Sequence, residues 1–186
     1  MRLFVALCPP EPVLDAVEAA VGPPRARWGG LRWARREQWH ITLAFYGELA
    51  PARLPALTRR LARVARRNAA PRLTVAGAGT FPRAERANVL WAGVGGDERG
   101  LRRLADAASA AGRRAGAPAD DKAFRPHVTL ARCRVPTDLT GAVADLAGLD
   151  AGEWQAEELL LIRSHTGPRP TYETLHTWRL GGPPAE

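Results

Sequence analysis

Cysteine and long apolar stretches are both scarce in this chain of 186 residues. Its two cysteines, Cys8 and Cys133, form no C-x-x-C pair, which excludes a disulfide-stapled scaffold and a cysteine-rich metal site. We expect both thiols to be buried. No apolar run approaches the roughly 18 residues of a membrane-spanning helix. Pro9 and Pro10 interrupt the apolar start MRLFVALC before a signal-peptide core could form. The sequence therefore predicts a cytoplasmic protein without a membrane segment.

Acidic residues are also in deficit, with 19 Asp and Glu against 27 Lys and Arg, a formal charge of +8 and a pI of about 11. Such a balance favours a polyanionic partner such as RNA, because each arginine that meets a phosphate releases condensed counterions. Lys122 is the only lysine, and the heavy use of Arg, Ala, Gly and Pro is typical of a GC-biased coding sequence. Part of the positive charge therefore carries no information about partners.

Apolar periodicity and turn residues divide the chain into strands and helices that occur in a similar series in each half. We expect strands at 2–8, 40–47, 72–81, 88–94, 127–135, 157–165 and 171–180, and helices at 12–21, 51–68, 97–116 and 138–146, the first of them stopped by the GPP at 22–24. This pattern predicts a single α+β domain over residues 1–186, built from two similar lobes by internal duplication.

Histidine is rare, with four in the chain, yet two of them begin nearly identical segments, HITLA at 40–44 and HVTLA at 127–131. Because side chains alternate along a strand, His40 and Thr42 share one face, as do His127 and Thr129. If the two strands lie side by side, two imidazoles and two hydroxyls converge on one cleft. One histidine can then act as general base and the other as general acid in metal-free hydrolysis of a phosphodiester whose oxygens the hydroxyls hold.

The two histidines have two other interpretations. A lone His-x-Thr is most often a structural part of a strand, but a second copy at matching positions in the other half argues against that explanation. Two histidines could also be zinc ligands. No carboxylate or cysteine stands at ligand spacing beside either one, so we expect no metal.

The chain resembles the 2H phosphoesterase superfamily, and within it the bacterial and archaeal RNA 2′,3′-cyclic phosphodiesterases, also called 2′-5′ RNA ligases. The similarity rests on MRLFVAL, HITLAFYGEL, VLWAGV, FRPHVTLAR and SHTGPRPTYETLHTWRL, in that order, and covers nearly the whole chain. It implies two lobes of antiparallel sheet with helices outside and a central cleft between them. It also implies hydrolysis of a terminal 2′,3′-cyclic phosphate to a 2′-phosphate, with no metal or other cofactor.

The resemblance also suggests a role for each motif residue. His40 is similar to the family's proton donor to O3′ and His127 to the proton acceptor that activates water. Thr42 and Thr129 are similar to its phosphate-holding hydroxyls, and Arg132 to its phosphate-binding arginine.

Strict alternation would point the side chain of Arg132 away from the cleft. Either the strand bulges after Ala131 or Arg132 reaches around the edge of the sheet. A structural arginine paired with a carboxylate is the other interpretation.

Several further residues were considered for the cleft. Tyr172 is the candidate for stacking on a base, although a packing role is common for such a tyrosine. We expect Phe45 and Trp91 to pack in the core, and His165 and His176 to be structural or at the rim, because neither lies in a His-x-Thr pattern. The paired arginines of the helices and connections are expected to be solvated.

The expected partners are RNA ends with a 2′,3′-cyclic phosphate, or cyclic nucleotides, and the expected state is a monomer. Two alternative functions remain at this point. The first is the reverse chemistry, 2′-5′ ligation of RNA, which would use the same phosphate site. The second is a non-catalytic RNA- or nucleotide-binding module, although the intact histidines and threonines argue against it.

Overall fold

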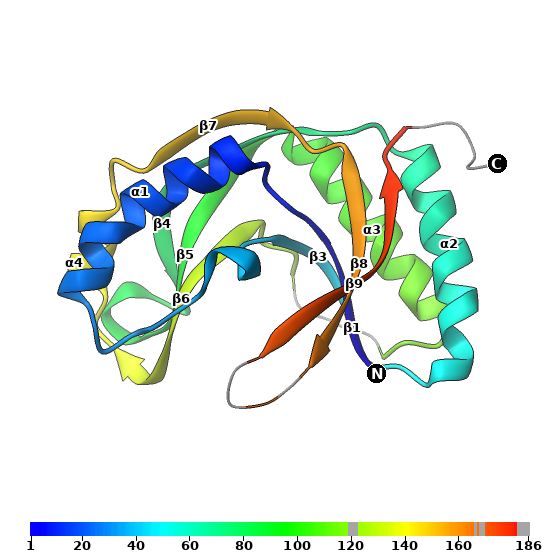
Figure 1. Ribbon diagram of the computed structural model, residues 1–186, viewed down its shortest axis with the longest axis horizontal. Helices are drawn as coiled ribbons and strands as arrows, with labels where there is room; N and C mark the ends of the chain where they lie inside the picture. Colours follow the sequence, from blue (N-terminus) through cyan, green and yellow to red (C-terminus); the bar gives the residue numbers. More distant parts are fainter. Residues whose placement is uncertain (119–122, 166, 168–169, 182–186) are drawn as a thin grey trace.

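A nine-stranded antiparallel sheet organises the chain in the computed structural model, which describes residues 1–118, 123–165, 167 and 170–181 (Figure 1). The strands run in the order β7-β4-β5-β6-β3-β1-β8-β9, and the short β2 pairs with β6. The strands are β1 (Arg2–Leu7), β2 (Arg32–Trp33), β3 (Ile41–Glu48), β4 (Arg72–Phe81), β5 (Ala87–Gly96), β6 (His127–Thr137), β7 (Asp150–Gln155), β8 (Glu158–His165) and β9 (Thr171–Arg179).

The sheet divides into two arms that correspond to the expected lobes. One arm is β7-β4-β5-β6 and the other is β3-β1-β8-β9. In the described part of the chain the arms meet at one residue pair, Ile41 with Val128, each of which directly follows a motif histidine. The α+β class with two antiparallel lobes is therefore confirmed, and the junction between the lobes brings the two motifs together.

Helices cover the outer side of both arms (Figure 1). They are α1 (Glu11–Arg27), α2 (Leu54–Arg67), α3 (Glu98–Arg114) and α4 (Thr140–Asp145), with 3₁₀ turns at Arg36–Gln38, Pro51–Arg53 and Ala84–Arg86. Helix α1 packs along β7, α4 on β4, and α3 on β3 and α2. Apolar side chains at helical spacing, such as Leu57 and Leu61 of α2 and Leu101 and Leu104 of α3, are buried in the core.

The junction of α3 with β3 depends on a glycine. The Tyr46 hydroxyl donates a hydrogen bond of 3.0 Å to the carbonyl of Ala108. A Cβ at Gly112 would overlap Cε1 of Tyr46, so only glycine allows this ring to reach the helix. The contact anchors the strand that carries the first motif.

The structure corrects three local expectations. Helix α1 does not stop at GPP but continues through Pro23 and Pro24, because the buried Pro24 packs in the last turn and its carbonyl accepts from Trp28 N at 2.8 Å. Strands β2 and β7 were not predicted, since both are short and largely polar. Cys8 is exposed and not buried, because it follows the last core residue of β1. Among the described helices none has the length and apolar character to cross a membrane.

Candidate active site

A bulge in β3 decides which side chains of the first motif face the cleft. Thr42 is opposite Ala6 and Ala44 is opposite Val5, which leaves Leu43 without a partner on β1. Leu43 and Ala44 both enter the main core as a result. The next residue, Phe45, therefore turns to the same side as Thr42 and away from the main core, and it packs on a smaller apolar cluster of Phe4, Ala6 and Ile162.

The second motif contains an equivalent bulge. Thr129 is opposite Trp91 and Ala131 is opposite Leu90, so that Leu130 is the extra residue of β6. Leu130 and Ala131 are both buried in the core. Arg132 consequently returns to the side of Thr129 and lines the cleft. A bulge is indeed what directs Arg132, but it lies before Ala131 and not after it.

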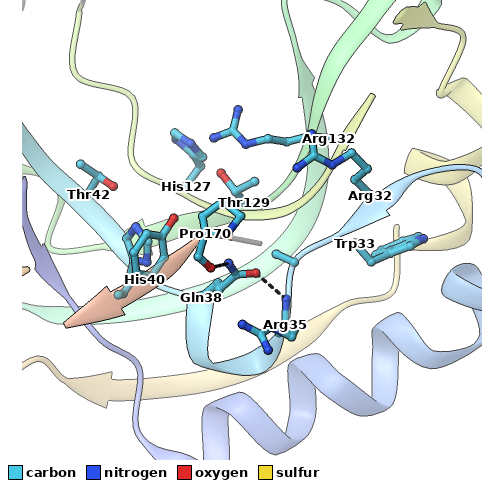
Figure 2. Close-up of a pocket in the computed structure, with 12 residues that line it drawn as sticks. Arg32, Trp33, Arg35, Gln38, His40, Thr42, His127, Thr129, Arg132 and Pro170 are labelled. Carbon is cyan, nitrogen blue, oxygen red and sulfur yellow. Dashed lines mark hydrogen bonds between the residues drawn. The ribbon is translucent and has the colours of Figure 1, made fainter. Parts of the chain in front are cut away.

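The two motifs open into one cavity of about 400 Å³ at the junction of the arms (Figure 2). All six residues singled out in the sequence line it: His40, Thr42, His127, Thr129, Arg132 and Tyr172. The other lining residues are Arg32, Trp33, Ala34, Arg35, Gln38 and Pro170. The described lining contains three arginines and no carboxylate, and such a cavity favours an anionic ligand.

The ring of His127 is held in one tautomer. Its Nδ1 lies 2.7 Å from the carbonyl of Arg125 and must donate to it, which leaves Nε2 of the neutral ring as an acceptor. Phe81 packs against this ring in a T-shaped arrangement, with centroids 4.9 Å apart. Burial lowers the pKa of His127; the backbone hydrogen bond to Arg125 opposes this effect and the charge of Arg132 adds to it.

The ring of His40 has a more apolar environment. It stacks on Phe4 at 4.8 Å, and Tyr172 packs edge-on at 5.4 Å. Burial lowers the pKa of His40 to about 4; the backbone of Gln38 opposes this, whereas the charges of His127 and Arg132 reinforce it. Both imidazoles are therefore neutral in the empty cleft at neutral pH, and either becomes a better proton acceptor once an anion lies beside it.

A wall of the cleft that the sequence did not predict is formed by Arg32, Trp33, Ala34, Arg35 and Gln38 of the segment 32–38. Ala34 N donates to the carbonyl of Leu130 at 2.8 Å, which holds this segment beside β6. Gln38 accepts from Arg35 N at 3.0 Å and donates through Nε2 to the carbonyl of Pro170 at 3.2 Å (Figure 2). The one sequence signal for this wall is the dense Trp and Arg content directly before the first motif.

The other two histidines do not line the described cavity. His165 pairs with Glu173 at 2.9 Å and His176 stacks on Trp178 at 5.4 Å. Trp91 does not pack in the main core, because it is opposite Thr129 and lies against Phe81 on the cleft side. Within the described residues, no three His, Cys, Asp or Glu side chains gather as metal ligands would.

Comparisons with known proteins identify the family of this chain. Residues 9–168 match the family model of the 2′-5′ RNA ligase superfamily. A relative from Thermus thermophilus, named RNA 2′,3′-cyclic phosphodiesterase, is 36% identical over 197 residues, covering 98% of this chain and 91% of the relative. The chain belongs to the 2′-5′ RNA ligase superfamily. A relative of the same name from Geobacillus stearothermophilus is 32% identical over 154 residues, which are 82% of this chain, and the chain spans about half of its length (48%).

Solved structures of other proteins share the fold. The crystal structure of the Thermus thermophilus protein TT0787 is 34% identical with a TM-score of 0.78, covering 98% of this chain and 99% of that one. Escherichia coli LigT complexed with 3′-AMP is 26% identical with a TM-score of 0.75, covering 97% and 98%. The family expected from the resemblance over nearly the whole chain is confirmed, and the name RNA 2′,3′-cyclic phosphodiesterase that these relatives carry agrees with the expected enzyme class.

Proposed function

We propose that this superfamily member hydrolyses the terminal 2′,3′-cyclic phosphate of RNA to a 2′-phosphate, with His127 as general base and His40 as general acid. The observation that carries the proposal is the convergence of two imidazoles, two hydroxyls and Arg132 on one cavity whose described lining has no carboxylate. Such a cavity can neutralise a phosphate and move protons on both sides of it without a metal.

Each step of the reaction has a residue suited to it. Nε2 of His127 takes a proton from water, and the resulting oxygen forms a new bond to phosphorus. The bond from phosphorus to O3′ breaks, and protonated His40 gives its proton to O3′. Thr42 and Thr129 donate hydrogen bonds to the non-bridging oxygens, and Arg132 offsets the charge that gathers on the phosphate.

The assignment of acid and base follows the resemblance to the family, since both rings have a similar backbone contact, His127 with Arg125 and His40 with Gln38. Nδ1 of His127 is already committed to the carbonyl of Arg125, which presents Nε2 to the cavity as an acceptor. His40 is neutral in the empty cleft, and the substrate must therefore raise its pKa. An anionic phosphate in direct contact stabilises the imidazolium, so substrate binding favours protonation of His40.

The names of the relatives support this activity. The relatives from Thermus thermophilus and Geobacillus stearothermophilus are both named RNA 2′,3′-cyclic phosphodiesterase, and LigT binds the nucleotide 3′-AMP. Ligation of a 5′-hydroxyl RNA end would pass through the same phosphate site in reverse. Hydrolysis is the favoured net reaction because water is in large excess over any bound 5′-hydroxyl.

The test is incubation of the purified protein, in EDTA, with an oligoribonucleotide that ends in a 2′,3′-cyclic phosphate, followed by phosphorus NMR. The proposal expects a 2′-phosphate as the sole product. A 3′-phosphate product would overturn the assignment of O3′ as the leaving group. Binding without turnover would favour the binding-module alternative, and a 2′-5′ linked product with a 5′-hydroxyl RNA would favour ligation.

A further inference from the structure

Arg32 is the neighbour of Arg132 across two paired strands. Strand β2 runs antiparallel to β6 with Arg32 directly opposite Arg132 and Trp33 opposite Ala131. Residues directly opposite each other in an antiparallel pair project to the same face of the sheet, with Cβ atoms about 4.5–5.5 Å apart. Both arginines line the cavity, and Figure 2 shows Arg32 beside Arg132 on the side away from His40.

This arrangement places two like charges together without a compensating acid. In the described residues no carboxylate forms a salt bridge with Arg32 or Arg132, whereas nearby Arg36 pairs with both Glu11 and Asp15. Like charges directly opposite on neighbouring strands destabilise a sheet. Two such arginines in one cavity are stabilised when anions bind between or beside them.

The proposed reaction uses only one of these two cations. In the proposed reaction Arg132 serves the cyclic phosphate, which lies between the two histidines. Arg32 lies directly opposite Arg132 on β2, on the side of the cavity away from His40 (Figure 2). An RNA end supplies a second anion at such a place, because the nucleoside that carries the cyclic phosphate is joined through its 5′ oxygen to the preceding phosphodiester.

We propose that Arg32 binds the phosphate on the 5′ side of the terminal nucleoside, and thereby makes the enzyme prefer RNA ends over cyclic mononucleosides. The inference rests on the proposed function, since it uses the position of the cyclic phosphate. Arg32 is exposed, so a phosphodiester with a chain attached can reach it. Its strand is held by the hydrogen bond from Ala34 N to Leu130 and by Trp33 Nε1, which donates to the carbonyl of Trp28 at 3.1 Å. The backbone that carries Arg32 therefore needs little ordering when the phosphate binds.

The probes are three substrates that share one cyclic phosphate: adenosine 2′,3′-cyclic phosphate, the same nucleotide with a 5′-phosphate, and a diadenylate ending in the 2′,3′-cyclic phosphate. We expect the native enzyme to have a higher kcat/KM on the second and third. Arg32→Gln should reduce that preference about tenfold or more, mainly through KM, because it removes a charge-assisted contact. Arg32→Lys should retain part of the preference. Arg63→Gln, which removes an exposed charge from α2, is the matched control and should change neither activity nor preference.

Two results would overturn the inference. Arg32→Gln could leave the preference intact, or it could lower kcat/KM equally on all three substrates, which would mean that Arg32 acts at the cyclic phosphate. Failure of the proposed function is a separate result, in which the native enzyme turns over none of the substrates. In that case calorimetric binding of adenosine 2′-phosphate, with and without a 5′-phosphate, tests Arg32 directly: loss of the difference in Arg32→Gln supports the inference, and its persistence overturns it.

Discussion

Phe45 and Arg132 occupy equivalent positions in the two motifs, each following a bulge whose extra residue is a buried leucine. Leu43 has no partner on β1 and Leu130 has none on β5. Both bulges turn the residue that follows them toward the cleft side, so the two motifs share this backbone irregularity. The side chains at this position differ. Phe45 presents an aromatic ring that packs on Phe4, whereas Arg132 presents a guanidinium to the cavity. This difference breaks the symmetry of a site whose histidines and threonines are otherwise paired.

The charge of Arg132 acts on both histidines, which leads to the first prediction. Because that charge lowers the pKa of His40 and of His127, Arg132→Gln should raise both pKa values in the empty cleft. The measurement is an NMR titration of the imidazole protons. Arg134→Gln removes an exposed charge two residues along the same strand and serves as the control. Unchanged histidine titration in Arg132→Gln would contradict the electrostatic role of this arginine.

The second prediction concerns the two histidines themselves. Replacing either His40 or His127 with alanine should lower kcat on a 2′,3′-cyclic phosphate by about a hundredfold or more, the usual scale of general acid–base catalysis. The kcat of the double variant should be only slightly lower than that of the less active single variant, because acid and base act in one transition state. His176→Ala removes an exposed ring that stacks on Trp178 and should leave kcat unchanged. Additive losses in the double variant would mean that the histidines act in separate steps.

The main site could be predicted from the sequence because side chains along a strand alternate between its two faces. His40 and Thr42 had to share a face, as did His127 and Thr129, and repetition of the same pattern in both halves indicated that the two faces meet. The structure brings both pairs to one cavity. Tyr172 was also placed at the site, although its edge-on contact with His40 depends on how β9 pairs with β8.

The bulges and the cleft wall could not be predicted from the sequence in this way. Leu130 and Ala131 are both apolar, so nothing in the residue types marks the place where alternation fails, and the side chain of Arg132 could not be assigned to a face. Phe45 was assigned to the wrong face for the same reason. The wall formed by residues 32–38 contains a strand of two residues, too short for any periodic pattern. Its position depends on hydrogen bonds to distant Leu130 and Pro170.

The third prediction is a pH dependence of stability caused by His40. Its pKa is about 4 in the folded protein, below the 6.5 of an unperturbed histidine. The unfolded chain therefore binds more protons between these values, so the stabilisation is fully present above about pH 6.5 and is lost as the pH falls toward about 4. The loss should be on the order of 2–3 kcal/mol.

Urea unfolding at several pH values measures this effect. The variant His40→Asn keeps a polar side chain but cannot titrate, so its free energy of unfolding should fall less steeply over the same range than that of the native protein. The shifted pKa of His127 acts in the same direction and remains in both proteins, which makes the difference between them specific to His40. Parallel pH profiles for the two proteins would show that His40 titrates normally in the fold.

The fourth prediction links a glycine of β4 to the position of His127, the proposed general base. A Cβ at Gly79 would overlap Cη2 of Trp91, so Gly79→Ala must displace the indole. Trp91 lies 5.4 Å from the ring of Phe81 and 6.4 Å from that of His127. Overpacking should cost about 1–3 kcal/mol in unfolding free energy, and displacement of His127 should lower kcat as well.

Thermal unfolding and kcat on a cyclic phosphate separate these two effects. Gly30→Ala is the matched control, because no atom lies within 4 Å of the added Cβ and the residue has no positive φ. If Gly79→Ala lost stability while kcat stayed at the native value, the indole could move without disturbing His127. A loss of both would instead mean that the Trp91 and Phe81 rings hold the imidazole in place, in addition to the hydrogen bond from Nδ1 to Arg125.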